Sequence, residues 1–515
     1  MEHSSSSSSI SRRDMLRLSA LGAMSAHLGA SSPAPGASSG SKKASSGRPN
    51  IIVILADDLG YGDVSCHGAT KVQTPNIDRL ASEGVLFTDA HSPSSVCTPT
   101  RYGLLTGRYC WRTWAQSGCV WADDPLLIEE DRMTVAKLLK SEGYVTGCVG
   151  KWHLGFGKTS GPERWSGPNW NGQLRPGPPE VGFDYYFGHP TVNGTTPTVY
   201  IENHHVVGLE KKDPMRIVPR DPVSYIHSYL ERPRNGVNVV LRMEGGKAAI
   251  HELEEMAATE TSKAVLFIER NRAKPFFLYF SPANIHGPHR PNAKFKGASQ
   301  CGVRGDFIHE LDWVVGEILK TLDRLNLADQ TLVVFSSDNG GDFFEQFGHK
   351  SNGELRGEKT TVWEGGHRVP FLARWPGKIK AGARSDQMIA LTDTLATCAA
   401  IVGGSLPPNA GPDSFNILPA LLGQAGDKPV RDSLVMDSWG GLMAIRQGPW
   451  KLILGKGSGG RPEKRPSKDD DAPGQLYNLA DDLREQKNLY NQHPEIVQRL
   501  TTLFETIKNE GRSQA

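Results

Sequence analysis

Residues 51–58 read Ile-Ile-Val-Ile-Leu-Ala-Asp-Asp, an apolar run that ends in two carboxylates. A short, continuous run rich in β-branched side chains is typical of a strand buried on both faces of a parallel sheet. Residues 276–280 (Phe-Phe-Leu-Tyr-Phe) and 332–335 (Leu-Val-Val-Phe) have the same character, and residues 146–150 are a weaker candidate. We therefore predict at least four core strands, each of which runs into polar residues at its carboxyl end.

Helical patterns separate these strands. The predicted helices cover residues 77–83, 134–142, about 248–271 and 306–325. The first two are followed by Gly84 and Gly143, the residue type that helix C-caps favour. Strands that alternate with helices predict a doubly wound α/β sheet, in which ligands bind outside the carboxyl ends of the strands. The polar residues after the four strands are therefore expected to form one site.

Acidic and amide side chains follow two of the predicted strands. Asp57 and Asp58 end one strand, and Asp338 and Asn339 follow another. All four offer oxygen ligands, which suit a hard cation, Ca²⁺ in preference to Mg²⁺. Taken singly, the first pair could be a solvated strand end and the second a plain turn. Two such clusters at the ends of two core strands favour the metal site.

A second informative run is Cys97-Thr98-Pro99-Thr100-Arg101. A proline two places after the cysteine suits the first turn of a helix, where its missing N–H costs nothing. The Cys97 thiol is therefore expected at the positive end of a helix, with Arg101 on the same helix face. A single cysteine is more often a small buried apolar residue. The residues around Cys97 favour a functional site instead.

This run and the segment 104–108 behind it resemble the signature of the type I sulfatases, in which the cysteine is oxidised to Cα-formylglycine. The chain is similar to that family, in family order, at residues 57–58, 150–153, 285–286, 337–340, 357–359 with 364–366, 476–479 and 488–489. Together these motifs are far more specific than any one of them. The resemblance implies the alkaline-phosphatase-like α/β fold: a large doubly wound mixed or parallel sheet flanked by helices, with a smaller C-terminal antiparallel sheet and helix.

The resemblance also implies an arylsulfatase-type activity, the hydrolysis of sulfate monoesters by a formylglycine hydrate at position 97. The modified Cys97 would join the four oxygen donors as a ligand of a single Ca²⁺-type ion. One hydroxyl of the hydrate attacks sulfur, and the second lets the sulfated intermediate collapse. Matching positions make Asp338 the activator of the attacking hydroxyl. Arg101 and Lys151 would hold the modified residue, and His153 would accept the proton that triggers collapse.

The same resemblance assigns substrate contacts to Lys151, His286 and Lys359, and the last two would also help to protonate the leaving oxygen. Both His286 and His289 have the His-x-Pro form of the family, and the distance from the preceding strand favours His286. Lys350 is an alternative to Lys359, and the Gly-x-Lys spacing favours Lys359. A formylglycine-generating or sulfatase-maturating enzyme is the implied partner.

Two other functions stay open at the level of the sequence. One is a phosphonate or phosphate diester hydrolase that uses the same aldehyde. Relatives with two zinc ions place His after the Asp that corresponds to Asp338, so Asn339 favours one hard ion and a sulfate ester. The other is a non-catalytic protein that binds sulfated glycans, which requires Cys97 to stay a thiol. We expect the substrate to be a sulfated carbohydrate.

The first 48 residues differ in composition from the rest of the chain. Arg12 and Arg13 precede a modest apolar stretch and a tract rich in Ser, Ala, Pro and Gly. This pattern predicts a bacterial Tat-type export signal, with a disordered basic tail as the alternative, and hence a periplasmic or secreted protein. Removing these residues changes the net charge from +2 to −2. A chain this close to neutral is not expected to have a broad charged surface that binds nucleic acid or membrane. No apolar run predicts a mature membrane span.

Length and turn signals predict the division of the 515 residues. We expect a signal and linker at 1–48, a catalytic domain at 49–428 and a smaller C-terminal α+β domain at 429–515. The last domain is expected to contain strands and a final helix at residues 442–445, 450–454, 475–479 and 494–509.

Residues 155–245 are expected to form a long irregular insertion that shapes the substrate pocket. Its aromatic residues could stack on a sugar, although packing within the loop is the better-supported alternative. They are Trp165, Trp170, Tyr185 and Tyr186, with the pair His204 and His205 beside them.

The chain has seven cysteines, so at least one is unpaired. We expect Cys97 to be such a residue. Cys110 and Cys119 are close enough in sequence for a disulfide after export, and two separate buried thiols are an alternative that is at least as well supported.

Overall fold

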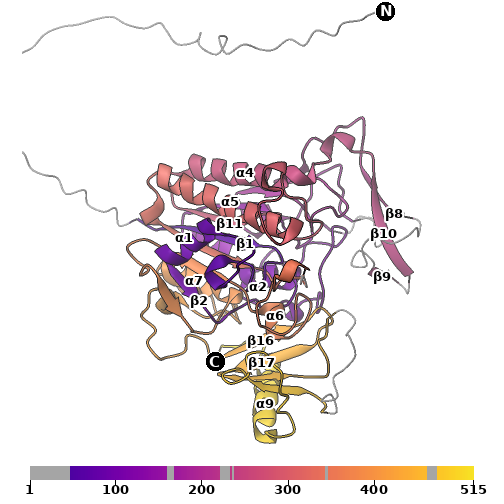
Figure 1. Ribbon diagram of the computed structural model, residues 1–515. Helices are drawn as coiled ribbons and strands as arrows, with labels where there is room; N and C mark the ends of the chain where they lie inside the picture. The colour runs from indigo at the N-terminus through magenta and orange to yellow at the C-terminus, as the bar shows by residue number, and fades with distance from the viewer. Residues whose placement is uncertain are drawn as a thin grey trace, which may run out of the picture. The chain divides into compact units, whose positions relative to one another are not determined.

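The computed structural model describes residues 47–158, 167–220, 232–234, 237–342, 346–460 and 472–514. Within these residues, ten strands form one sheet (Figure 1). Their order is β14 (Ala383–Ser385), β2 (Val85–Phe87), β13 (Phe371–Arg374), β12 (Thr331–Ser337), β1 (Asn50–Ala56), β11 (Phe276–Ser281), β4 (Val145–Gly150), β5 (Tyr185–Gly188), β6 (Ile201–Glu202) and β7 (His205–Val206). The four predicted core strands are β12, β1, β11 and β4, which are consecutive neighbours in the sheet.

The centre of the sheet is parallel, from β12 through β1, β11 and β4 to β5. On either side, β13 and β6 pair antiparallel with their neighbours, so the sheet is mixed. Every residue of β1 is buried. Ile51 and Val53 belong to the core on one face, and Ile52 and Ile54 belong to the core on the other. This two-sided burial explains why the strand is apolar throughout rather than alternating.

Helices cover both faces, which confirms the predicted doubly wound fold. The helices on the face of Ile51 are α2 (Cys97–Thr106), α3 (Val135–Ser141) and α7 (Thr394–Ile401). The helices on the face of Ile52 are α1 (Pro75–Glu83), α4 (Met256–Asn271) and α5 (Gly302–Arg324). Figure 1 shows α4 and α5 side by side above the sheet. The prediction placed the start of α4 too early and the start of α5 too late.

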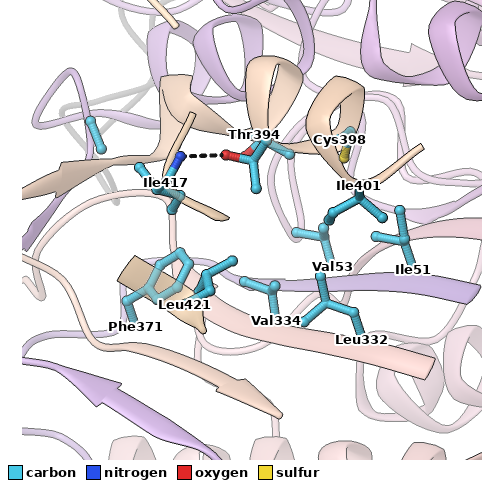
Figure 2. A pocket seen from close by; sticks show the side chains of 12 residues that line it. Ile51, Val53, Leu332, Val334, Phe371, Thr394, Cys398, Ile401, Ile417 and Leu421 are labelled. Atoms are coloured by element: carbon cyan, nitrogen blue, oxygen red, sulfur yellow. Dashed lines mark hydrogen bonds between the residues drawn. The ribbon is translucent and has the colours of Figure 1, made fainter. Parts of the chain in front are cut away.

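A small cavity of about 30 Å³ lies between α7 and the sheet (Figure 2). Its lining includes Ile51, Val53 and Leu332 from the strands and Cys398 from the helix. Among the described residues that line it, none carries a charge. The cavity is therefore a packing void in the apolar core and not a place for polar chemistry.

The predicted irregular insertion is wrong in part, because residues 155–245 contain strands β5 to β10. Three of them, β8 (Arg216–Arg220), β10 (Val237–Glu244) and β9 (Arg232–Arg234), form an antiparallel sheet. Trp170 is only 4% exposed and Tyr186 is a buried residue of β5, so both pack into the protein. Trp165 lies outside the described residues.

The C-terminal residues form an antiparallel sheet covered by one helix. The sheet consists of β16 (Ser433–Asp437), β17 (Met443–Gln447), β18 (Trp450–Ile453) and β19 (Gln475–Asn478), and the helix is α9 (Pro494–Glu510). The sequence predicted all of these except β16. Residues 47–515 form one compact unit, and the domain boundary at 428 stays a prediction.

Short elements complete the described chain. They are β3 (Ala90–His91), which pairs with β15 (Ile389–Ala390), and the one-turn helices α6 (Glu364–His367) and α8 (Leu418–Leu421). The expected export signal lies almost entirely outside the described residues. Among the helices that are described, none is both long enough and apolar enough to cross a membrane.

Candidate active site

The polar residues at the ends of the four central strands converge on one place. The loops after β1 and β12 are tied together by the amide of Asp338, which donates to the carbonyl of Ala56 at 3.1 Å. The loops after β1 and β11 are joined by the amide of Asp57, which donates to the carbonyl of Asn284 at 3.0 Å. Because these strands are parallel neighbours, their carboxyl ends meet at one sheet edge.

Helix α2 brings the cysteine run to this edge. Cys97 is its first residue, and Gly107 ends it in the left-handed conformation at φ 63°. The whole helix is buried. The hydroxyl of Thr98 donates to the carbonyl of His153 at 2.8 Å, which ties the first turn to the loop after β4. The predicted helix start at Cys97 is confirmed.

The Cys97 sulfur lies within the acidic cluster. Its distance to Asp57 Oδ1 is 3.5 Å. One potential ligand atom from each of Asp57, Asp58, Cys97 and Asp338 lies within 4.8 Å of the other three. The spacing places position 97 where an oxygen nucleophile could share a cation with three carboxylates.

Arg101 neutralises the deepest of these carboxylates. Its side chain is fully buried, and Nε and Nη2 donate to Asp338 Oδ2 at 3.0 and 2.7 Å. Nη1 donates to the hydroxyl of Ser281, at the end of β11, at 2.5 Å. Burial and the neighbouring Asp57 nevertheless raise the pKa of Asp338 to about 7. A further positive charge, such as a bound cation, would therefore favour the ionised form of Asp338.

Two lysines hold the carboxylates that follow β1. Lys151 Nζ lies 2.7 Å from Asp57 Oδ2, and Lys359 Nζ lies 2.5 Å from Asp58 Oδ2. Burial alone would raise the pKa of Asp57, but Lys151 and the other nearby cations outweigh it and hold that pKa well below its usual range. Asp57 is therefore ionised, as a ligand of a hard cation must be.

Asn339 gives an independent sign that the cluster suits a cation. Its Nδ2 donates to Asp58 Oδ1 at 2.8 Å, which directs the amide into the acidic cluster. Its Oδ1 is buried and has no hydrogen-bond partner among the described residues. An unpaired buried carbonyl oxygen costs about 1–3 kcal/mol. The donor set of three carboxylates and this free oxygen fits Ca²⁺, and this observation does not depend on any motif.

Two histidines complete the site. His153 is 2% exposed, and neither ring nitrogen has a partner among the described residues. Burial and the charge of Lys151 hold the pKa of His153 well below its usual range, so the ring is neutral and able to accept a proton. His286 Nε2 lies 3.6 Å from Asp58 Oδ2. Its Nδ1 lies 2.6 Å from the carbonyl of Gly287, so Nδ1 carries the proton.

The structure also separates the alternatives for the last two residues. Lys350 is exposed and pairs with Glu354 at 2.8 Å, so Lys359 is the lysine at the cluster. The ring of His289 packs edge-on against Phe307 at 6.3 Å. The structure thus brings together all ten residues that the sequence proposed.

A comparison with known families identifies the family of the chain. Residues 49–404 match the family model described as Sulfatase. The chain belongs to the sulfatase family. It is therefore a sulfuric ester hydrolase with an alkaline-phosphatase-like fold.

Individual sulfatases match over most of the chain. An N-acetylgalactosamine-6-O-sulfatase of Bacteroides thetaiotaomicron is 39% identical, over 90% of this chain and 93% of its own. The steryl-sulfatase of Rattus norvegicus is 34% identical, over 73% and 70% of the two chains. A solved structure from work on glycosaminoglycan metabolism by Bacteroides thetaiotaomicron has a TM-score of 0.81 at 39% identity and covers 90% of this chain and 100% of that one.

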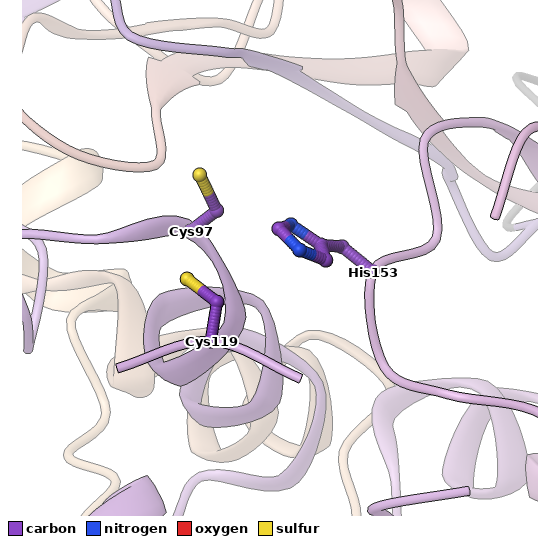
Figure 3. Close-up of side chains that lie close together, drawn as sticks. All are labelled: Cys97, Cys119 and His153. Carbon is purple, nitrogen blue, oxygen red and sulfur yellow. The ribbon is translucent and has the colours of Figure 1, made fainter. Parts of the chain in front are cut away.

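Sequence reasoning missed two residues of this sulfatase site. Ser281 holds Arg101, and its signal was its place at the end of a predicted strand. Cys119 lies next to Cys97 and His153, as Figure 3 shows. The predicted alternative of a Cys110–Cys119 disulfide is wrong, because none of the seven cysteines, all in the described part of the chain, forms one. A hydrogen bond with Cys97 lowers the pKa of Cys119 to about 6.

Proposed function

We propose that this sulfatase removes sulfate from sulfated glycans, with 6-O-sulfated N-acetylgalactosamine as the first candidate substrate, and that it uses formylglycine at position 97 and one Ca²⁺. The observation that carries the proposal is the Cys97 sulfur at 3.5 Å from Asp57, inside a buried cluster of carboxylates and cations. The substrate rests on the name of the 39% identical relative.

The metal would be held by Asp57, Asp58, Asp338 and Asn339, with position 97 as a further ligand. When bound, Ca²⁺ would withdraw electron density from the sulfate and favour the ionised nucleophile. The three carboxylates face the cations Arg101, Lys151 and Lys359, so the charges of the protein alone cancel. A divalent ion would leave the site positive, as an anionic sulfate ester requires. Mg²⁺ fits less well because it demands stricter geometry and keeps its waters.

The modification explains why a cysteine is found among hard ligands. A thiolate is a soft donor and suits Ca²⁺ poorly. Formylglycine hydrate would supply one hydroxyl as the nucleophile and a second that permits release of sulfate.

The remaining roles follow from the contacts of the chain. Asp338 Oδ1 is free of Arg101 and is the carboxylate oxygen suited to accept a proton at position 97. Lys151 and Arg101 hold the anionic form. His153, which is neutral and has no partner among the described groups, accepts the proton that starts sulfate release. Lys359 and His286 lie on the Asp58 side, where they would bind sulfate oxygens and protonate the leaving alcohol.

The strongest competing activity is that of a phosphonate or phosphate diester hydrolase. A phosphonate monoester hydrolase of Agrobacterium radiobacter has the same fold, with a TM-score of 0.57, but it is only 18% identical. The much greater identity to sulfatases favours a sulfate monoester. A protein that only binds sulfated glycans would have to retain the Cys97 thiol.

We further propose that the chain is exported through a Tat-type signal at its N-terminus and is matured by a formylglycine-generating or sulfatase-maturating enzyme. The proposed export rests on Arg12 and Arg13, which lie outside the described residues. The proposed maturation rests on the Cys-x-Pro-x-Arg run at residues 97–101.

The experiment combines a mass measurement with a substrate panel. The chain is co-expressed with a maturating enzyme, and the peptide that contains residue 97 is expected to show loss of the thiol. The converted protein is expected to release sulfate from 6-O-sulfated N-acetylgalactosamine faster than from its 4-O-sulfated isomer, and to lose activity in a chelator until Ca²⁺ is restored. Faster turnover of a phosphate diester, or full activity with an alkylatable thiol at position 97, would overturn the proposal.

A further inference from the structure

Cys97 lies between two donor sets of opposite chemical character. On one side are the carboxylates Asp57, Asp58 and Asp338. On the other side are Cys119 and His153, whose sulfur and ring nitrogen lie, with the Cys97 sulfur, within 4.8 Å of one another. Figure 3 shows the two thiols and the imidazole ring close together. The sulfatase chemistry proposed above uses His153 of this second set as a proton acceptor and gives Cys119 no role.

The second set has the composition of a site for a soft or borderline cation. Two thiolates and one imidazole are ligands of Zn²⁺ and related ions, with bond lengths near 2.3 Å to sulfur and 2.0 Å to nitrogen. Donor atoms within 4.8 Å of one another need only a small contraction to share one such ion. Each comes from a different part of the fold: the start of α2, the loop around residue 119 and the loop after β4.

His153 provides the observation that points to a ligand. Its ring is 2% exposed, and neither nitrogen has a hydrogen-bond partner among the described residues. Its backbone is fixed, because its carbonyl accepts from Thr98 and its amide donates to the carbonyl of Pro190 at 2.9 Å. Trp121 packs edge-on against the ring at 6.5 Å. A buried imidazole held in place and left without a partner is suited to bind a metal.

We propose that, before Cys97 is converted, Cys97, Cys119 and His153 bind one thiophilic divalent cation such as Zn²⁺. Both sulfur ligands must be thiolates in the complex, so binding releases the protons that the free thiols still carry. Conversion of Cys97 removes one of the two sulfur ligands and replaces it with hydroxyls, which are hard donors suited to the carboxylate side. The chemical state of residue 97 then decides which cation the site accepts. The change of cation preference rests on the proposed formylglycine. Cation binding by the thiol form does not depend on it.

The test uses the full chain expressed without a maturating enzyme, with a thiol at position 97 verified by mass and kept reduced by a phosphine. Co²⁺ is the probe, because thiolate ligands give it charge-transfer absorption. We expect one Co²⁺ per chain with thiolate bands, displacement by Zn²⁺ and no displacement by Ca²⁺. Cys119→Ser is expected to weaken binding by at least about tenfold. Cys66→Ser is the matched control, since Cys66 is also partly exposed but belongs to none of the described donor clusters.

A Co²⁺ spectrum of the unconverted wild-type chain without thiolate bands would overturn the proposal, whatever the variants do. Equal affinity in Cys119→Ser, with an unchanged unfolding transition, would overturn it as well. Failure of the sulfatase assay leaves this result unaffected, because the measurement needs neither conversion nor substrate. A converted chain that binds Co²⁺ through thiolate as tightly as the unconverted chain would refute the exchange of cation preference.

Discussion

The proposed chemistry requires two oxygen atoms on one carbon at position 97. Cys97→Ser supplies a single hydroxyl beside Asp57, so it can be sulfated once but cannot release the sulfate. We expect at most one sulfate transferred per chain, detected as a covalent sulfuryl adduct by intact mass. Cys110→Ser is the control, because Cys110 is also buried but contacts Ala115 rather than the site. Steady turnover by Cys97→Ser would contradict the need for a second hydroxyl.

Asp63 is a buried carboxylate next to the site, and its contacts are sensitive to acid. It accepts from Arg304 Nη1 at 2.8 Å and from His349 Nε2 at 2.7 Å, while Arg304 also donates to the carbonyl of Asp58 at 3.0 Å. Burial alone would raise the pKa of Asp63, but Arg304 and His349 outweigh it and lower the pKa to about 2.

A lowered folded-state pKa has a defined effect on stability. The contribution of Asp63 is complete above its unfolded pKa of about 4 and is lost as the pH falls toward about 2; it amounts to about 2 kcal/mol. Asp63→Asn should therefore lower the free energy of unfolding at pH 7 and flatten its decline between about pH 4 and pH 2, measured by urea denaturation. The exposed Asp386→Asn is the control. If the free energy of unfolding of Asp63→Asn declined as steeply as that of the wild type between about pH 4 and pH 2, this assignment would be refuted.

At the level of residues, the sequence was sufficient to predict those functional side chains that directly follow a core strand. Asp57, Asp338 and Lys151 could be placed together because parallel strands align their carboxyl ends. Cys119 could not, since it lies in a loop without periodicity and meets Cys97 only through tertiary packing. Local patterns carry no information on which loop closes over a helix N-terminus.

Helix α3 illustrates how one side chain fixes an element. Thr134 Oγ1 accepts from the amide of Lys137 at 3.0 Å and donates to the carbonyl of Val181 at 2.6 Å. Thr134→Val keeps the shape and loses both bonds, so we expect a loss of about 1–3 kcal/mol in the free energy of unfolding. Thr134→Ser keeps the hydroxyl and is expected to cost less than half as much. Equal losses in the two variants, by urea denaturation, would show that the hydroxyl is not the cause.

Element prediction succeeded where burial leaves a local pattern. The central strands were found because both of their faces are apolar, whereas β5 to β9 have only two to five residues and depend on distant partners. Gly84 shows a different limit. The prediction made it a helix cap, yet its φ is −144°, and a Cβ there would lie 2.1 Å from the carbonyl of Ala373. The glycine is required by the close approach of β13 and not by the end of α1.

At the scale of the molecule, a buried ion cluster joins the C-terminal sheet to the catalytic part. Lys451 of β18 is fully buried, and its Nζ lies 3.0 Å from Glu364 Oε1 in α6 and 2.8 Å from Glu485 Oε1. Arg446 of β17 adds a second link, at 2.7 Å from Asp89. The contacts with Glu364 and Asp89 cross the predicted boundary at residue 428, so this boundary is an interface with buried charges.

Lys451→Met tests whether the two sheets unfold together. The substitution preserves apolar volume but removes the cation shared by two buried glutamates, leaving Glu364 with Arg368 alone, which costs about 3–5 kcal/mol. If the sheets are coupled through this cluster, calorimetry will show a single transition that moves to lower temperature as a whole. Lys378→Met, at an exposed position, is the control and should leave the transition in place. Two transitions, of which only the smaller moves, would instead establish residues 429–515 as a domain that unfolds independently.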